Sequence, residues 1–355
     1  KRVLELMMSG HPNSCLACLH REACEKARPK PTKAGRTTRC AFCSNRSDCE
    51  LRSMTLDLAK DRDLALPLLY SAHNLERFDP FMDRDYNLCI LCGRCWRICE
   101  KIHGQPAISV VNRGRWAKVG TSYNRDHTES GCKFCGACID ICPTATLTDR
   151  YAKWYGKPDA EVPSTCSLCP VGCEFKLALE AGKVIAGVMK AFNRDSRLCT
   201  LGRFAYGPIT NNPGRLRRAM VRDGADLIGV SYDDAIAAVG PRLKEFSGSL
   251  VIVANEGDSR ETKYIYRKFA EAMKGQIGFV PAGGSFDDIK PASVKADLAA
   301  GKFKAAMIAG DYLPADLVCK LEYLVVVDFM PTEAAELASA VFPAAALAEV
   351  GGTIR

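Results

Sequence analysis

The chain has 355 residues, of which 19 are cysteine, and a formal net charge of +8. This length predicts roughly two to four modules. Because the sequence shows no signal peptide and no long apolar run, it predicts a cytoplasmic protein without a membrane segment, whose thiols bind metal instead of forming disulfides.

The positive charge does not predict a nucleic-acid partner. The first 52 residues carry eleven Lys and Arg against five Asp and Glu, so most of the excess lies in one segment that also holds six Cys. Thiolates that bind a metal are negatively charged, and basic residues around such thiolates explain the excess.

The N-terminal segment begins with a short apolar run over residues 3–8, which predicts a helix. A pattern H-x3-C-x2-C-x5-C follows, formed by His11, Cys15, Cys18 and Cys24. One imidazole can replace a thiolate on a cubane. The spacing therefore predicts a [4Fe–4S] cluster with one His ligand, against the alternatives of a zinc ligand or a surface His.

A second Cys trio repeats the C-x2-C-x5-C spacing without a His. It consists of Cys40, Cys43 and Cys49, with Arg36 where the His would stand. We expect one metal site per trio, the second being a fifth cubane or zinc, completed by a distant ligand. Two other arrangements stay open: one trio could be empty, or the sites could be His11, Cys15, Cys18 and Cys49 for a cluster and His20, Cys24, Cys40 and Cys43 for zinc.

The central stretch contains the pattern C-x2-C-x2-C-x3-C twice. In this arrangement the fourth Cys of each run ligates the other cluster. Zinc prefers separated pairs of ligands, and a disulfide set would not repeat one period. The spacing predicts two [4Fe–4S] clusters, one on Cys89, Cys92, Cys95 and Cys142 and the other on Cys132, Cys135, Cys138 and Cys99.

Two short strands are expected between the two central runs, over 107–111 and 116–120. A further thiolate set follows the central stretch. The set has the pattern C-x2-C-x3-C and one remote Cys, which predicts another cubane, with zinc as the alternative. Its members are Cys166, Cys169, Cys173 and Cys199. The apolar runs 175–179 and 183–188 around Gly182 predict a hairpin beside it.

From residue 203 onward the sequence predicts an α/β domain. Apolar runs over 249–254, 303–310 and 323–328 are expected as buried strands, with helices over 259–273 and 332–338. Strands that alternate with helices form a parallel sheet. No G-x-G-x-x-G fingerprint follows a strand here, so no nucleotide site is predicted. Cys319 is expected to be a packed thiol.

These patterns together resemble the large iron–sulfur subunit of respiratory complex I and the related subunits of NAD-linked formate dehydrogenases and electron-bifurcating hydrogenases and transhydrogenases. The His11 motif, both central runs and the Cys166–Cys199 set carry this resemblance. Residues 199–203, 215–220, 328–333 and 341–353 resemble the molybdopterin oxidoreductase family. The family's [2Fe–2S] domain is expected upstream of the His11 motif.

Two departures concern the molybdenum site of that family. Active members have a Lys two residues after the last cluster Cys, and here that position is Leu201. No Cys lies between Cys199 and Cys319 that could replace the family's metal ligand. The resemblance with these departures implies a vestigial domain without molybdopterin and without a catalytic centre of its own.

The implied fold is α+β with four parts: a His/Cys module (1–84), a two-cluster ferredoxin-like domain (85–150), a cluster subdomain (151–205) and a vestigial α/β domain (206–355). The implied function is electron transfer, over four to five [4Fe–4S] clusters, between a flavin-containing NADH-oxidising partner and another redox partner such as ferredoxin, NADP or a hydrogenase or formate module. The implied setting is a soluble, bifurcating complex of an anaerobe. A fragment of a catalytic molybdenum or tungsten formate dehydrogenase and a metal-stabilised scaffold are the alternatives.

Overall fold

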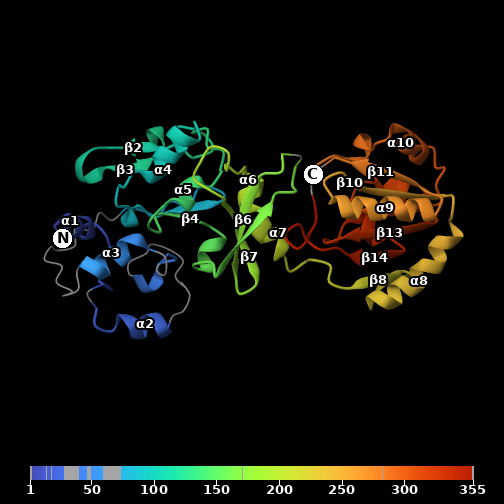
Figure 1. Cartoon of the computed structure of the whole chain (residues 1–355), viewed down its shortest axis with the longest axis horizontal. Coiled ribbons are helices and arrows are strands. Elements are labelled where there is room, and N and C mark those ends of the chain that lie inside the picture. Colours follow the sequence, from blue (N-terminus) through green and yellow to red (C-terminus); the bar gives the residue numbers. More distant parts are fainter. Residues whose placement is uncertain are drawn as a thin grey trace. The chain divides into compact units, whose positions relative to one another are not determined.

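The computed structural model describes residues 2–12, 14–16, 18–27, 40–45, 49–58, 73–169, 171–281 and 283–353. The chain divides into two compact units. Unit 1 consists of Lys1–Ser164 and Cys173–Asn211, and unit 2 of Thr165–Gly172 and Asn212–Arg355. Figure 1 labels the elements of both.

Unit 1 begins with three short helices and one 3-10 turn: α1 (Arg2–Ser9), α2 (Arg21–Ala27), η1 (Cys40–Phe42) and α3 (Glu50–Leu58). The helix expected over 3–8 is confirmed as α1. Leu4 and Met8, four residues apart on one face of α1, are buried in a small apolar cluster with Leu51 of α3. The apolar residues Met54, Leu56, Leu58 and Leu64 also predict a helix; its first part is α3, and its continuation through Leu64 lies outside the described residues.

The middle of unit 1 is built from short elements that follow one another closely. They are β1 (Met82–Arg84), η2 (Tyr86–Leu88), α4 (Arg94–Arg97), the π-helical turn η3 (Ile98–Ile102), β2 (Ser109–Val111), η4 (Gly114–Trp116), β3 (Lys118–Gly120), η5 (Ser122–Asn124), α5 (Ala137–Asp140), β4 (Leu147–Asp149) and η6 (Ala152–Trp154). Strand β1 pairs with β4, and β2 with β3, both antiparallel. The latter pair confirms the two short strands expected between the central Cys runs.

A small sheet completes unit 1. Its strands β5 (Ala160–Thr165), β6 (Glu174–Glu180) and β7 (Lys183–Met189) lie in this order, and β6 and β7 form the expected hairpin. The turn residues Ala181 and Gly182 have φ of 49° and 73°, as a two-residue hairpin turn requires. The helices α6 (Thr200–Phe204) and α7 (Tyr206–Thr210) follow, and a Cβ added to Gly187 of β7 would lie 2.2 Å from the Gly202 carbonyl oxygen. Glycine therefore lets α6 lie directly against the strand.

Unit 2 contains a seven-stranded mixed sheet in the order β11-β10-β12-β13-β14-β8-β9. The five strands from β11 to β14 are parallel, and the β8–β9 hairpin adds an antiparallel edge. The strands are β8 (Ala219–Asp223), β9 (Asp226–Val230), β10 (Leu250–Asn255), β11 (Gln276–Val280), β12 (Ala305–Ala309), β13 (Tyr323–Asp328) and β14 (Ala340–Pro343). The expected strands are confirmed as β10, β12 and β13.

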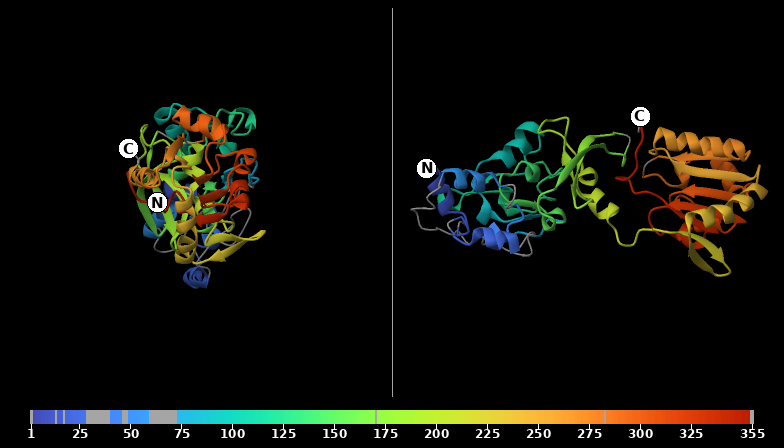
Figure 2. Two further views of the ribbon diagram at one scale, coloured as in Figure 1. Left: turned by 90° about the vertical axis from the view of Figure 1, so that its right-hand side faces the viewer. Right: turned by 60° about the horizontal axis from the view of Figure 1, so that its bottom comes forward.

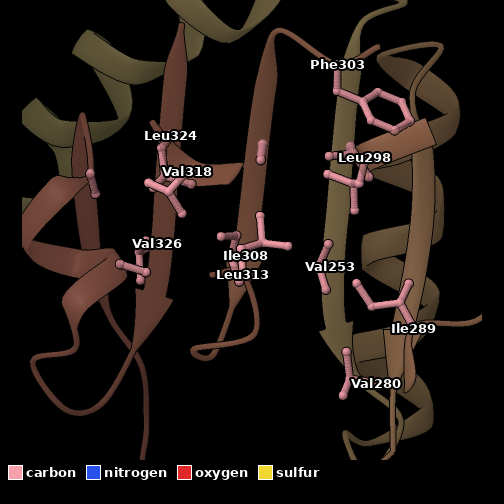
Figure 3. Close-up of a cluster of buried hydrophobic side chains, with 14 of the residues drawn as sticks. Val253, Val280, Ile289, Leu298, Phe303, Ile308, Leu313, Val318, Leu324 and Val326 are labelled. Atoms are coloured by element: carbon pink, nitrogen blue, oxygen red, sulfur yellow. The ribbon is translucent and has the colours of Figure 1, made fainter. Parts of the chain in front are cut away.

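Helices cover both faces of this sheet. One apolar cluster joins the strands to α10 (Ala292–Ala299), α11 (Ala315–Val318) and α12 (Glu333–Leu337), and another joins them to α8 (Tyr232–Glu245) and α9 (Arg260–Ala272). The two faces use alternate strand residues, as the pleat dictates: Leu324 and Val326 lie in the first cluster, and Tyr323 and Val325 in the second. Figure 2 shows the gold-to-red strands between helices, and Figure 3 shows the first cluster.

Two details of unit 2 bear on the sequence predictions. Thr332, at the start of the helix expected over 332–338, is its N-cap, since its hydroxyl accepts the Ala335 backbone N–H at 3.2 Å. The expectation of a packed Cys319 is wrong, because this thiol is exposed at the end of α11 while Leu317 and Val318 face the core. Among the described residues, none of the helices is sufficiently long and apolar to cross a bilayer.

Candidate metal centres

The two central Cys loops have the same backbone conformation. Two residues after the first Cys of each loop, Leu91 and Phe134 have φ of 53° and 47°. One residue after the second Cys, Gly93 and Gly136 have φ of 73° and 74°. Left-handed residues that recur in this way turn successive backbone N–H groups toward one side, which makes a concave site for an anion. Leu91 N–H accordingly lies 3.4 Å from Cys89 Sγ, and Phe134 N–H makes the equivalent contact to the first Cys of its own loop at 3.3 Å.

Four cysteines from both loops line one cavity. Three of them, Cys89, Cys92 and Cys95, come from the first loop, and Cys142 comes from the end of the second. The remaining lining is mainly apolar and includes Tyr86, Ile90, Gly93, Val119, Pro143, Thr144, Thr146 and Leu147. A cavity with four thiols and apolar walls fits a cubane, and the crossing of Cys142 is the exchange that this spacing requires.

The second thiol set lies beside the first. Cys138 is within electrostatic range of Cys132, Cys135 and Cys99, and also of Cys95 from the first set. The helices that carry these residues, α4 and its continuation η3 on one side and α5 on the other, are in contact with each other. The two sets are therefore neighbours, and the Cys predicted as the fourth ligand of each set comes from the other loop.

Burial raises the pKa of these thiols. The pKa of Cys95 is raised to about 12, and those of Cys89 and Cys132 to about 11, mainly because the surroundings are apolar, with the neighbouring thiols as a smaller cause. Such thiols hold their protons at neutral pH until a metal displaces them.

The thiols of these sets do not converge on one point. Within the described ranges, no three His, Cys, Asp or Glu side chains converge closely enough to hold one metal ion. A cubane spreads its four thiolates over four iron atoms, so it does not require such convergence.

A buried guanidinium joins the second set to the helix that follows Cys199. Arg203 of α6 is 3.1 Å from the Asp140 carboxylate and 3.3 Å from that of Asp149, with all three side chains at most 6 % exposed. Thr200 Oγ1 donates to the Lys133 carbonyl at 3.1 Å. These contacts hold the start of α6 against the Cys132–Cys138 loop.

The last thiolate set is divided between the two units. Cys166 and Cys169 belong to unit 2, and Cys173 and Cys199 to unit 1, so the set remains a prediction. The local geometry of one member is defined: Cys199 is the N-cap of α6, and its Sγ accepts the Gly202 backbone N–H at 3.5 Å.

The N-terminal His is buried, whereas the cysteines of its motif differ in exposure. Burial lowers the pKa of His11 to about 4, so its ring is neutral, and Nδ1 lies 3.3 Å from the Pro12 carbonyl oxygen. With Nδ1 protonated, Nε2 would keep its lone pair, which is the state of a metal ligand. Cys15 and Cys18 are partly buried, and Cys24 is exposed.

Several structural residues of the site were not predicted from the sequence. Arg84 is 2 % exposed, and it lies 3.1 Å from the Asp79 carboxylate and 2.7 Å from Nδ1 of His127. The backbone N–H of Cys132 donates to the His127 carbonyl, so this buried group supports the second Cys loop. Arg203 was also missed. The available signal was its position four residues after a ligand Cys, one helical turn along α6.

Comparison with known proteins identifies two cluster-binding regions. Residues 79–148 match the family described as NADH-quinone oxidoreductase subunit 3, ferredoxin-like domain. Residues 159–211 match the molybdopterin oxidoreductase Fe4S4 domain. The first match contains both central Cys runs, and the second contains the Cys166–Cys199 set.

Similarity to individual proteins extends over most of the chain. The NADPH-Fe(3+) oxidoreductase subunit alpha of Geobacter sulfurreducens is 31% identical over 285 residues, which are 78% of this chain and 30% of that protein. The NADH-quinone oxidoreductase subunit 3 of Thermus thermophilus is 28% identical over 254 residues, 66% of this chain and 32% of that protein. The chain thus spans about a third of the length of the relatives it matches.

A solved structure also shows limited similarity. It is a crystal structure of an NAD+-reducing [NiFe]-hydrogenase in the H2-reduced state, which is 22% identical, with a TM-score of 0.28, over 31% of this chain and 47% of that one. This likeness carries no argument about function.

Proposed function

We propose that this chain, which belongs to the family of complex I-type large iron–sulfur subunits, carries electrons between a partner that oxidises a reduced nicotinamide and a second redox partner. One observation carries the proposal. Two thiol sets lie side by side, Cys142 of the second loop lines the cavity of the first, and Cys95 of one set is within electrostatic range of Cys138 of the other. Neighbouring centres of this kind can pass electrons from one to the next.

Cubanes bound at these sites would supply reversible one-electron reduction and oxidation, over a range of potentials. The residues of the chain set those potentials and exclude water. Backbone N–H groups of Leu91 and Phe134 point at ligand sulfurs, and the apolar side chains Tyr86 and Leu147 line the first cavity. Hydrogen bonding to the sulfurs and burial are two of the terms that decide the potential of such a centre.

The proposed electron path continues from the second thiol set to the set that contains Cys199. Arg203 and Thr200 hold the N-terminus of α6, and therefore Cys199, against the Cys132–Cys138 loop. A third cluster on the Cys166–Cys199 set would then continue the path. This part of the proposal is supported by the Fe4S4-domain match over residues 159–211.

The donor and acceptor are proposed from the relatives. Those relatives are subunits of enzymes named for NADPH or NADH oxidation, which supports a flavin-containing partner that receives a hydride and releases single electrons. Ferredoxin, NADP, or a hydrogenase or formate module would be the other partner, in a cytoplasmic and bifurcating assembly. The chain itself would contribute no catalytic centre.

The experiment is reduction of the anaerobically purified complex by NADH or NADPH, followed by EPR and by iron and molybdenum analysis. We expect cubane signals from this chain to appear within the turnover time of the complex. Clusters that stay oxidised while the partner flavin is reduced would favour a scaffold. Stoichiometric molybdenum or tungsten together with formate oxidation would restore the catalytic alternative.

A further inference from the structure

The insert between the two central Cys runs has a surface of one charge sign. Residues 109–125 comprise β2, β3 and the turns η4 and η5, and they contain four Arg or Lys but no Asp or Glu. Three of these cations, Arg113, Arg115 and Arg125, are exposed, and within the described part of the chain none of them forms an ion pair. The fourth cation pairs with the Glu76 carboxylate at 2.9 Å. We call residues 109–125 the hairpin patch.

Large apolar side chains are exposed among these cations. Val110, at the middle of β2, is 50 % exposed, Trp116 in η4 is 53 % exposed, and Tyr123 in η5 is 93 % exposed. The Arg115 guanidinium lies 4.9 Å from the centre of the Trp116 ring, and the Arg125 guanidinium lies 6.0 Å from that of Tyr123. Aromatic residues and Arg are enriched in protein–protein interfaces and dominate their binding energy. The composition of the hairpin patch therefore favours a protein as its partner.

The backbone holds Tyr123 in a strained conformation. Its φ and ψ are 59° and 22°, in the left-handed region that bulky residues rarely adopt. The Thr121 hydroxyl donates to the Arg125 carbonyl, and Arg125 Nε donates to the Ser122 carbonyl at 3.3 Å, so the turn is fixed on both sides of Tyr123. Backbone strain of this kind is concentrated at functional positions. Here it fixes the orientation of an aromatic side chain that is almost fully exposed.

The hairpin patch shares a strand with the wall of the first central site. Val119 of β3 is 3 % exposed and lines the cavity that contains the four thiols of the Cys89–Cys142 set. Its direct partner across the two-stranded sheet is the half-exposed Val110. Lys118 Nζ lies 4.9 Å from the ring centre of Tyr86, another residue that lines the cavity. The same short sheet thus contributes to the cavity and to the exposed surface.

We propose that the hairpin patch is the docking site of an exchangeable redox protein with an acidic face, which exchanges single electrons with the Cys89–Cys142 site. The inference rests on the proposed electron-transfer function and adds the kind of partner. The carrier would lose one electron to that site or gain one from it, and no bond would form or break. Opposite charge on the carrier accelerates encounter and selects the partner.

The size of the hairpin patch supports an exchangeable carrier instead of a permanent subunit. A stable interface has about 20–30 residues on each side, whereas short-lived electron-transfer encounters use the smallest interfaces. The segment 109–125 is shorter than that, and only part of it is exposed. Three free guanidinium groups and two exposed rings are the groups that such a small contact would use.

The test is calorimetric titration of the anaerobically purified complex with an acidic plant-type ferredoxin, at low and at high salt. The dissociation constant of the wild type should rise with salt, because exposed charges are screened. A charge-reversal variant should raise it at least about tenfold at low salt, because like charges then face each other. This variant carries Arg113→Glu, Arg115→Glu and Arg125→Glu.

The matched control changes the net charge by the same amount at exposed cations of unit 2. It carries Arg218→Glu, Lys244→Glu and Lys320→Glu, and it should keep the dissociation constant of the wild type. Equal loss of affinity in both variants would show that only the net charge matters and would overturn the proposal. Absence of ferredoxin binding by the wild-type complex would also overturn it, since a permanent subunit would then cover the hairpin patch or no acidic carrier would fit it.

A second variant separates docking from folding. Tyr123→Gly removes the exposed ring, and glycine adopts a φ of 59° without strain. We expect its dissociation constant for ferredoxin to rise about tenfold, as for a central interface aromatic, while its unfolding temperature is no lower than that of the wild type. A lower unfolding temperature together with unchanged ferredoxin binding would make Tyr123 a structural residue and refute the docking role.

Two controls separate this proposal from its alternatives. If the charge-reversal variant loses affinity for single-stranded DNA but keeps its affinity for ferredoxin, the hairpin patch binds nucleic acid and the proposal is wrong. Failure of the proposed function has another signature, in which dithionite reduces the clusters of the complex but NADH and NADPH do not. Salt-dependent ferredoxin binding that the charge-reversal variant loses would support the docking site in that case too.

Discussion

Arg203 Nη2 donates a hydrogen bond to the Asp140 carboxylate at 3.1 Å, although the two residues lie 63 positions apart and their side chains are only 3 % and 5 % exposed. The carboxylate also accepts the Met189 backbone N–H at 3.1 Å. Arg203 Nη1 donates to the Gly187 carbonyl at 2.8 Å. This pair therefore connects α5, β7 and α6 in the interior of unit 1.

Arg203→Met should destabilise unit 1 strongly. Removing one partner of a buried ion pair typically costs about 3–5 kcal/mol, because the other charge stays buried without compensation. Denaturant unfolding of the cluster-loaded protein measures this cost. Lys190→Met is the matched control, since the Lys190–Glu174 pair is 56 % and 67 % exposed, and solvent-exposed pairs of this kind contribute little to stability. Equal denaturant concentrations at the unfolding midpoint of the two variants would contradict the structural role of Arg203.

Cys138→Ala should lower the iron content by about four atoms per chain, because its thiol lies among those of Cys132, Cys135 and Cys99. Soluble yield should fall as well, since metal binding contributes folding energy. Cys319→Ala is the control. Its thiol is exposed in unit 2, and its iron content should equal that of the wild type. Unchanged iron in Cys138→Ala would show that the ligand assignment is wrong.

Gly136→Ala should be more harmful than Gly93→Ala, although both residues have nearly the same φ. A Cβ at Gly136 would lie 2.2 Å from Nε of buried Arg203, whereas one at Gly93 would lie 2.6 Å from the outer end of the exposed Arg97. Gly131→Ala isolates the backbone strain, because φ is 75° and no atom lies within 4 Å. That strain alone costs about 1–2 kcal/mol. The unfolding temperature should fall most for Gly136→Ala, less for Gly93→Ala and least for Gly131→Ala. Any other order would refute the steric argument.

Cluster insertion into the apo-protein should become more favourable as pH rises. The pKa values of Cys89 and Cys95 are raised to about 11 and 12, mainly by burial, so at neutral pH each thiol must lose a proton when iron binds. Proton release makes the affinity increase with pH. Anaerobic reconstitution at pH 7 and at pH 8.5, followed by iron analysis, measures the effect. Equal occupancy at limiting iron would mean that the thiols are already ionised before binding.

We also predict that the purified chain contains no stoichiometric molybdenum or tungsten. Leu201, at the position where active relatives have a Lys, is 57 % exposed and offers no hydrogen bond to a pterin. Cys319, the next Cys after Cys199 in the sequence, lies at the end of α11 and is exposed. Inductively coupled plasma mass spectrometry of the isolated protein decides this. One molybdenum per chain would contradict the prediction.

The sequence predicted the parts of the fold in which one local signal dominates. Apolar runs gave β10, β12 and β13, and Thr332 gave the start of α12. Strand β11 was missed because Gln276 and Gly278 interrupt its apolar pattern, although its backbone pairs with β10 along five residues. Such a strand depends on its neighbours in the sheet, which no local window contains.

The candidate site shows the same division. The spacing of the central Cys runs predicted that Cys142 would cross to the first set, because three residues between thiolates fix a local geometry. The packing of Cys15 against the apolar cluster that contains Cys40 was not predictable in this way, since it depends on how α1 and α3 pack. Nor was the burial of Arg84 beside His127, 43 residues away, which depends on tertiary contacts alone.

The position of Cys142 in the first thiol set has a consequence for the loss of the central clusters in the presence of oxygen. The segment from Cys132 to Cys142 has three thiols in one set and its last thiol in the other, so bound clusters would anchor it at both ends. Destruction of either cluster would then free one end and loosen the remaining ligands of its neighbour. Oxidative bleaching of the two central clusters is therefore expected to follow one rate constant instead of two, and a damaged chain would lose its central electron path in a single event.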